Sequence, residues 1–382
     1  MTSALFIISL LCITAIIYIF SRVREKKSAG VKFIHYIKSE KRKRHRNRCN
    51  QEPLNLYAAF CNHLSPFHGN VSQEIAEHRV VTWQREYTRF TSEHRDSSGN
   101  QPVHTFFYDE ADYNPRFIDV LYKMCKSGIS DVEILLRNNQ NTTHEFKRKV
   151  EGFRDVLFHH HGLLRQNGKN ISFAFVHDYT AHSGSHSQRV LYDISQKHLI
   201  LKECGCYADF TFPPASGAPE PAFTNSICFS DTKTNRKKRA GVKNWLQDDL
   251  LLIEGPLGIN WRNRRFGLFP RIENGEISAR SRFTPHRARL WLETAPQIEG
   301  DTKNLFLKLH TYGAVDSTVR YLFGESGIHE LYGYLEKISA DNSDIILHYV
   351  SAHEMYRKIQ AVCNDSGVFS TPKGCNFGNP GF

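Results

Sequence analysis

Polar side chains that could carry chemistry follow several apolar, strand-like runs of the sequence. In chain order they are Asn62-His63, Asp109-Glu110, Arg137-Asn138-Asn139 and His177-Asp178. Histidines and carboxylates together suit acid–base catalysis or the binding of a divalent metal. If the strands are parallel, their carboxyl ends meet on one face and bring these groups together. The sequence therefore predicts one polar site built from strand ends.

Two further candidates stand at the ends of later strand-like runs. Asp209 follows the run 204–208, and His310 follows the run 305–309. We expect His63, Asp209 and His310 to be the catalytic candidates, and Asp209 to orient one histidine, as carboxylates do in hydrolytic sites. Asn62 and His177 are expected to face the same cavity. The competing interpretation is that these residues are structural, because no local spacing forces them together.

Strand-like and helix-like runs alternate along the body of the chain. Predicted strands lie at 54–61, 103–108, 132–136 and 171–176, and predicted helices at 71–87, 115–127 and 142–164. The helices show apolar residues at helical spacing, and Thr142 and Thr143 are suitable N-caps for the last of them. This alternation predicts an α/β architecture with a parallel sheet.

Several short segments occur in an order that resembles the polysaccharide deacetylases. They are 60–69 (FCNHLSPFHG), 105–108 (TFFY), 161–164 (HGLL), 173–177 (FAFVH), 205–213 (GCYADFTFP), 254–257 (EGPL), 270–275 (PRIENG), 308–311 (KLHT) and 347–350 (LHYV). The resemblance spans roughly 54–354. It implies a distorted (β/α) barrel, which we place at 53–360. The remaining residues, 361–382, are predicted to form an irregular tail because those from 364 onward are rich in Gly, Pro, Asn and Ser. The resemblance also implies a substrate-binding set, whose members are Asn62, His177, Tyr207, Arg271, Tyr312 and His348.

The metal-binding positions of that family hold other residue types here. The corresponding positions are Asn62, Leu135, Arg137, Asn138 and Asn139. Leucine cannot bind a metal, arginine repels one, and asparagine amides are weak neutral ligands. The family's usual metal site is therefore not expected. A divalent metal such as zinc is expected only if the remaining His and Asp side chains form a new site.

The amino-terminal residues predict a membrane anchor. Residues 2–21 carry no charge and are long enough to cross a bilayer as a helix, so we assign 1–21 to a transmembrane segment. The segment 22–52 is rich in Lys and Arg, which indicates a cytoplasmic flank that meets anionic lipid headgroups. Nine cysteines without a CxxC motif fit a reducing compartment. No nucleic-acid-binding motif accompanies the basic run, so nucleic acid is not an expected partner.

Three functions remain open at this point. The first is a single-pass membrane protein of carbohydrate metabolism that binds a glycan or lipid-linked saccharide through a degenerate deacetylase site. The second is an active metal-dependent carbohydrate deacetylase that uses a rearranged His/Asp site. The third is a non-catalytic scaffold in a glycan-assembly complex. Metal content and glycan binding distinguish the three.

Overall fold

The computed structural model describes residues 53–137, 142–178, 197–212, 223–231, 236–240, 250–265 and 269–365. The predicted anchor 1–21 and basic segment 22–52 lie outside these ranges, as do Asn138 and Asn139. Within the described ranges, no helix is both long and apolar enough to cross a membrane. The membrane anchor and its orientation therefore stay predictions.

A mostly parallel sheet forms the centre of the molecule, and β1 (Leu54–Leu64) is the second strand from one end of its order. On one side β1 pairs with β12 (Asn304–Thr311). On the other, its first half pairs with β13 (Ile345–Tyr349) and its second half with β2 (His104–Asp109). The parallel path continues through β3 (Ser130–Arg137), β5 (Asn170–Asp178), β6 (Cys206–Asp209) and β9 (Leu250–Glu254). The predicted α/β class with a parallel sheet is confirmed.

Antiparallel strands extend this sheet and form a second, smaller one. β7 (Ser226–Asp231) pairs with both β9 and β8 (Arg236–Arg239), and the short β4 (Arg165–Asn167) pairs with β5. β10 (Gly258–Arg265) and β11 (Phe269–Glu273) make a separate two-stranded sheet. The segment after β11 then runs beside the end of β12, as the hydrogen bond from Ile277 N to His310 O at 2.8 Å shows.

The main sheet is strongly curled. β12 and β9 are separated by the whole parallel path of strands, and neighbouring strands lie ~4.8 Å apart. In a flat sheet these two strands could not touch. Lys308 on β12 nevertheless donates from Nζ to the carbonyl oxygen of Ile253 on β9 at 2.7 Å and to that of Phe210, just after β6, at 2.9 Å. The buried lysine therefore bridges the two ends of the parallel path across a shared interior.

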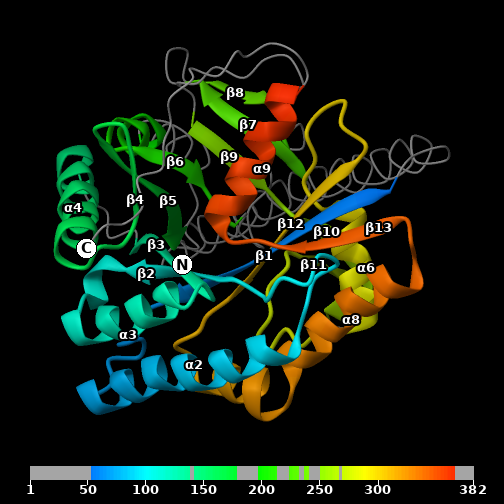
Figure 1. Ribbon diagram of the computed structural model, residues 1–382, viewed down its shortest axis with the longest axis horizontal. Coiled ribbons are helices and arrows are strands. Elements are labelled where there is room, and N and C mark those ends of the chain that lie inside the picture. Colours follow the sequence, from blue (N-terminus) through cyan, green and yellow to red (C-terminus); the bar gives the residue numbers. More distant parts are fainter. Residues whose placement is uncertain are drawn as a thin grey trace, which may run out of the picture.

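Helices cover the sheet, as the strand–helix alternation predicts. They are α2 (Gln73–Glu93), α3 (Pro115–Lys126), α4 (Thr143–Asp155), α6 (Pro285–Thr294), α7 (Asp316–Val319), α8 (Gly327–Asp341) and α9 (Ala352–Asp365), with short turns of helix at Glu110–Asp112, Val156–His160 and Arg320–Gly324 and a helical segment at 197–203. In Figure 1, α2, α3 and α8 lie along one side of the sheet, and α9 (red) crosses the other side near β1 and β12.

Two helix boundaries bear on the sequence predictions. Thr142 caps α4 as predicted, since its side chain accepts from the Glu145 amide and the Glu145 carboxylate accepts from the Thr142 amide. By contrast, α9 continues to Asp365, so residues 361–365 are helical and do not belong to an irregular tail. Cys363, which is buried one turn after Ile359, extends the buried face of α9 past the boundary that composition suggested.

Side chains of β1 alternate between two separate cores. Phe60 and Leu64 pack in the core beneath the helices, together with Trp83 of α2. Tyr57 and Cys61 pack in the interior core, which α9 also covers. Because successive side chains of a strand point to opposite faces, Asn62 and His63 are directed to different sides of the sheet. This alternation decides which of the predicted site residues can meet.

Candidate functional site

Two imidazoles and two aromatic rings gather on the interior face near the carboxyl ends of β1 and β12. We call His63, Phe212, His310 and Tyr312 the histidine–aromatic cluster. The rings of His63 and His310 are stacked with centroids 5.6 Å apart, and that of Phe212 stacks on His310 at 3.8 Å. Tyr312 meets His63 edge-on at 5.2 Å. Of the residues predicted to share one cavity, His63 and His310 meet here, and Tyr312 lies beside His63.

Burial sets the charge state of this cluster. His310 is 1% exposed, and its Nδ1 makes no hydrogen bond to any described residue. Burial lowers the pKa of His310 well below its usual value, and the nearby charges of His63 and Lys308 lower it further. At pH 7 the His310 ring is consequently neutral. A neutral imidazole can exchange hydrogen bonds with hydroxyl or amide groups, but it cannot attract an anion by charge.

Lys308 holds the segment that carries Phe212, one of the rings of the cluster, through hydrogen bonds. Its Nζ donates to the carbonyl oxygens of Phe210, Thr211 and Ile253, which uses all three ammonium hydrogens. It also lies 4.2 Å from the centre of the Phe212 ring. Burial lowers the pKa of Lys308 to about 8. A fully bonded ammonium of this kind holds the Phe210–Phe212 segment against β12 and is not placed to act as a nucleophile.

An arginine joins the ends of β2 and β3 at the same edge of the sheet. Arg137 donates from Nη2 to Asp112 Oδ1 at 2.9 Å, and its Nε contacts Asp109 Oδ2. Ser65, just after β1, donates to Asp109 Oδ2 at 2.8 Å. The Phe67 amide donates to the other oxygen of Asp112 at 2.8 Å. A fixed guanidinium thus lies between two carboxylates at the end of β3.

Asp109, one of the two carboxylates around Arg137, is costly to ionise without that arginine. Burial raises the pKa of Asp109 to about 6, although the charge of Arg137 and the hydrogen bond from Ser65 act to lower it. Asp109 is fully buried, whereas the Arg137 side chain is 35% exposed. Leu135 lies in the interior core and offers no ligand atom. This edge of the sheet therefore carries a positive charge that the protein itself supplies.

Asn62 positions a turn and does not face the cluster. Its Oδ1 accepts from the Gly313 amide at 2.8 Å, and Trp83 Nε1 donates to the Gly313 carbonyl at 2.7 Å. An added Cβ on Gly313 would lie 2.3 Å from the Asn62 amide. The expected substrate-binding role of Asn62 is thus replaced by a positioning role, because Asn62 alternates with His63 along β1 and fixes the turn that follows Tyr312.

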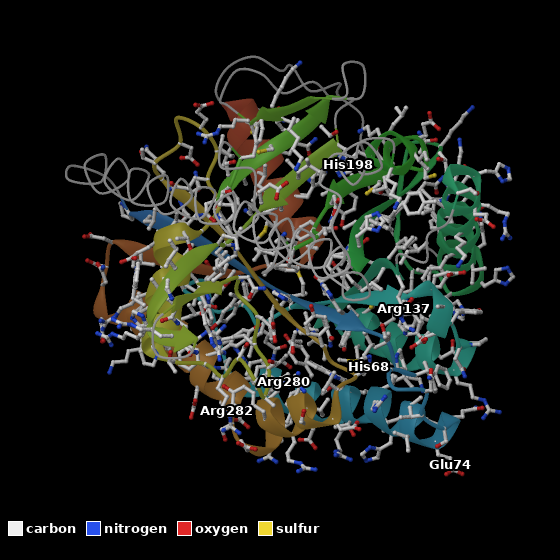
Figure 2. The ribbon with its side chains drawn as sticks, turned by 180° about the vertical axis from the view of Figure 1, so that it is seen from behind. His68, Glu74, Arg137, His198, Arg280 and Arg282 are labelled. Carbon is white, nitrogen blue, oxygen red and sulfur yellow. The ribbon has the colours of Figure 1, made fainter. Side chains whose placement is uncertain are left out.

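His177 and Asp209 lie apart from the histidine–aromatic cluster. His177 stacks on Phe146 of α4 with centroids 5.4 Å apart, on the helix side of the sheet. Asp209 Oδ2 lies 3.3 Å from Nε2 of His198, a residue that the sequence interpretation did not single out. Figure 2 shows His198 well away from Arg137. The expected common cavity of His177, Asp209 and His310 is not formed, because side chains at the strand ends alternate between two faces.

Three other predicted substrate-binding residues lie away from the cluster. Tyr207 is buried and donates to Glu133 Oε1 at 2.5 Å. His348 pairs beside the first half of β1 and contacts Asn55 Oδ1 at 2.9 Å, at the opposite end of the strand from His63. Arg271 is exposed on β11, in the separate two-stranded sheet. Motif order alone does not report at which end or face of a sheet a residue lies.

Several residues of the site escaped the sequence interpretation. Lys308 and Phe212 complete the interior cluster, and Asp112 completes the arginine network. Lys308 could have been found from the sequence, because a lysine inside an apolar strand-like run such as 304–311 is buried and needs hydrogen-bond acceptors there. Asp112 had none, since its position depends on the turn after β2.

The arrangement offers no ready metal centre within the described ranges. Among those residues, no group of three or more His, Cys, Asp or Glu side chains is placed to hold a metal ion. The rings of His63 and His310 are stacked with centroids 5.6 Å apart, but within the described ranges no third His, Cys, Asp or Glu side chain is placed with them to hold an ion. Chemically, the cluster is suited to stacking and to neutral hydrogen bonding.

Comparison with known proteins does not assign a family. No protein-family model matches the chain, and no curated protein matches it. Among solved structures, the chain is similar to the crystal structure of 4-alpha-glucanotransferase from Thermococcus litoralis, with 10% sequence identity and a TM-score of 0.41. The match covers 81% of this chain and 41% of that one. The chain thus spans less than half the length of the glucanotransferase.

Proposed function

We propose that this chain binds a glycan, or a lipid-linked saccharide, at the carboxyl-end face of its parallel sheet without the metal of the polysaccharide deacetylases it resembles. The observation that carries the proposal is Arg137 held between Asp109 and Asp112. A divalent ion placed there would meet a fixed positive charge, and the carboxylates it needs are already engaged. The positive charge at this edge is supplied by the chain itself.

The histidine–aromatic cluster supplies contacts suited to a sugar. Tyr312 is partly exposed above the buried rings of His63 and His310, so a ligand would reach Tyr312 first. Aromatic faces favour the apolar face of a sugar ring, and the neutral imidazole of His310 bonds hydroxyl or acetamido groups in either direction. The neutral state of His310 favours an uncharged or N-acetylated saccharide over a strongly anionic one.

A glycan array probed with the purified full-length chain tests the proposal. Tyr312→Ala should weaken binding of the strongest glycan about tenfold, the amount expected for one lost stacking contact. Tyr334→Ala is the matched control, because Tyr334 is a partly exposed tyrosine on α8 that packs against Phe283, away from the cluster and from Arg137. Absence of any glycan binding would favour a non-catalytic scaffold and overturn the proposal.

An active hydrolase with a rearranged metal site is the competing outcome of the same experiment. Elemental analysis of the protein, purified without chelators, distinguishes it. One metal per chain that is lost in both His63→Ala and His310→Ala would support that alternative, because these two imidazoles are stacked in the interior. Substoichiometric metal, unaffected by either change, supports glycan binding without metal.

We also propose that residues 1–21 anchor the protein in a membrane and that the basic segment 22–52 meets anionic lipid on the cytoplasmic side. The support is the uncharged segment followed at once by Lys and Arg. A reporter fused after Phe382 should behave as cytoplasmic. A periplasmic or lumenal signal would reverse the orientation.

A further inference from the structure

A serine, a histidine and an aspartate form a hydrogen-bonded series on the helix side of the sheet. Ser230 Oγ of β7 lies 3.2 Å from His198 Nδ1, and His198 Nε2 lies 3.3 Å from Asp209 Oδ2. The three residues are 3%, 5% and 6% exposed, respectively. They come from β7, from the helical segment 197–203 and from β6, so the fold brings three separate segments to one point.

The aspartate of this series is held firmly and stays anionic. The amide of Thr211 donates to Asp209 Oδ1 at 2.8 Å, and the Thr211 hydroxyl donates to the same oxygen. The His177 amide in turn donates to the Thr211 hydroxyl at 2.9 Å. Burial alone would raise the pKa of Asp209, but the hydrogen bond and charge of His198, with smaller effects from His177 and Thr211, lower it to about 2.

We propose that Ser230, His198 and Asp209 form a metal-independent acyl-transfer site for small carboxylic esters. A serine hydroxyl becomes a nucleophile when a neighbouring imidazole can take its proton, and a fixed carboxylate orients that imidazole and stabilises its charged form. Ser230 is the nucleophile and His198 the general base, while Asp209 is a positioning residue. This site is separate from the histidine–aromatic cluster and does not depend on glycan binding there.

The reaction balances with water as the co-substrate. Ser230 Oγ attacks the ester carbonyl carbon while its proton passes to His198 Nδ1. The C–O bond to the alcohol breaks, and the alcohol leaves with the proton from His198. Water then attacks the acyl-serine and gives a proton to His198, which returns it to Ser230 as the carboxylic acid departs.

The buried position of Ser230 calls for small probes. The purified full-length chain is treated with phenylmethylsulfonyl fluoride, and with p-nitrophenyl acetate as substrate. We expect a covalent sulfonyl adduct on the peptide that contains Ser230, found by mass spectrometry, and a burst of p-nitrophenol that the adduct suppresses. Absence of that adduct in the folded protein would overturn the proposal.

Matched variants separate a reactive serine from a structural hydrogen bond. Ser226→Ala is the control, because Ser226 is a buried serine of the same strand whose hydroxyl donates to the Phe223 carbonyl. It should react like the unaltered chain. Ser230→Ala should lose the adduct, and His198→Gln should slow adduct formation at least a hundredfold. Reaction of His198→Gln at the unaltered rate would contradict the proposed base.

The positioning role of Asp209 has its own readout. Asp209→Asn should slow adduct formation and move its pH profile toward acid, because the imidazolium loses its anionic neighbour. A merely structural loss would lower the unfolding midpoint and leave the pH profile of the remaining folded protein in place, which would refute that role. Ser230→Ala should keep the glycan affinity of the unaltered chain, so failure here leaves the glycan proposal standing.

Discussion

Arg137 donates from Nη2 to Asp112 Oδ1 at 2.9 Å, across the gap between the end of β3 and the turn that follows β2. The same guanidinium contacts Asp109, which is fully buried. This pairing places a permanent cation where the sequence resemblance would have placed metal ligands. It also ties three strand ends together, since Ser65 after β1 donates to Asp109.

Replacing Arg137 with Gln should destabilise the protein in a pH-dependent way. The change leaves Asp109 buried without its cation, at a cost of about 2 kcal/mol at pH 8, discounted because Arg137 is partly exposed. Burial already raises the pKa of Asp109 to about 6, and loss of Arg137 raises it further. Below about pH 5 Asp109 is protonated in the variant, so the cost should shrink there.

Urea unfolding of both proteins at pH 5 and pH 8 measures this difference. Arg89→Gln is the control, because Arg89 makes an exposed pair with Glu93 on α2 and should change the free energy of unfolding by less than about 0.5 kcal/mol. An equal loss of stability for Arg137→Gln at both pH values would contradict the role assigned to Asp109.

The sequence predicted the elements better than it predicted the site. Apolar runs and helix caps located strands such as 54–61 and 132–136, because core burial imposes those patterns. The convergence of His63 with His310 followed from parallel strands ending at one edge. The separation of Asp209 from that pair did not follow, since a one-residue difference in register reverses the face of a side chain. His198 depends on tertiary contacts alone.

Gly313→Ala should disturb the turn that carries Tyr312. The new Cβ would lie 2.3 Å from the Asn62 amide, so either the turn or Asn62 must move, at about 1–3 kcal/mol. Glycan affinity should fall with stability because Tyr312 is the neighbouring residue. Thermal unfolding and glycan binding check this prediction together.

Gly152→Ala is the control for that substitution. Gly152 lies inside α4 with nothing within 4 Å of an added Cβ, and alanine should stabilise the helix by about 0.5–1 kcal/mol. A Gly313→Ala protein with unchanged stability and glycan affinity would show that the Asn62 contact does not position the turn.

His104→Phe should reduce the acid sensitivity of the fold. The His104 ring is fully buried against Trp83, with centroids 4.9 Å apart, and neither ring nitrogen bonds a described residue. Burial lowers the pKa of His104 to about 3. Between pH ~6.5 and ~3 the unfolded chain therefore binds a proton that the folded chain does not. The free energy of unfolding consequently decreases as the pH is lowered through this range.

Phenylalanine cannot bind this proton in either state. The difference in the free energy of unfolding, variant minus unaltered chain, should therefore increase as the pH falls. The expected gain over the unaltered chain between pH 7 and pH 4.5 is about 2–3 kcal/mol. Denaturant unfolding across this range measures it. Parallel stability–pH curves for the two proteins would show that His104 does not supply the acid sensitivity.

Lys308→Met should weaken the closure of the curled sheet. The ammonium bonds the carbonyls of Phe210, Thr211 and Ile253, and methionine would leave these acceptors buried without that donor, at about 2–4 kcal/mol. Hydrogen exchange of β6 and β9 amides should accelerate. Lys123→Met changes an exposed residue on α3 and serves as the control, so it should leave the exchange of the β6 and β9 amides unchanged. If these amides were equally protected in the Lys308→Met and Lys123→Met variants, Lys308 would not be the bridge.

The most direct test of the central claim is the affinity for the strongest array glycan, measured by calorimetry before and after exhaustive chelation. Arg137 supplies the positive charge at the carboxyl-end face, so the account predicts the same Kd in both states and no effect of added zinc. Loss of binding after chelation, with recovery when zinc is returned, would contradict the account and favour a rearranged metal site.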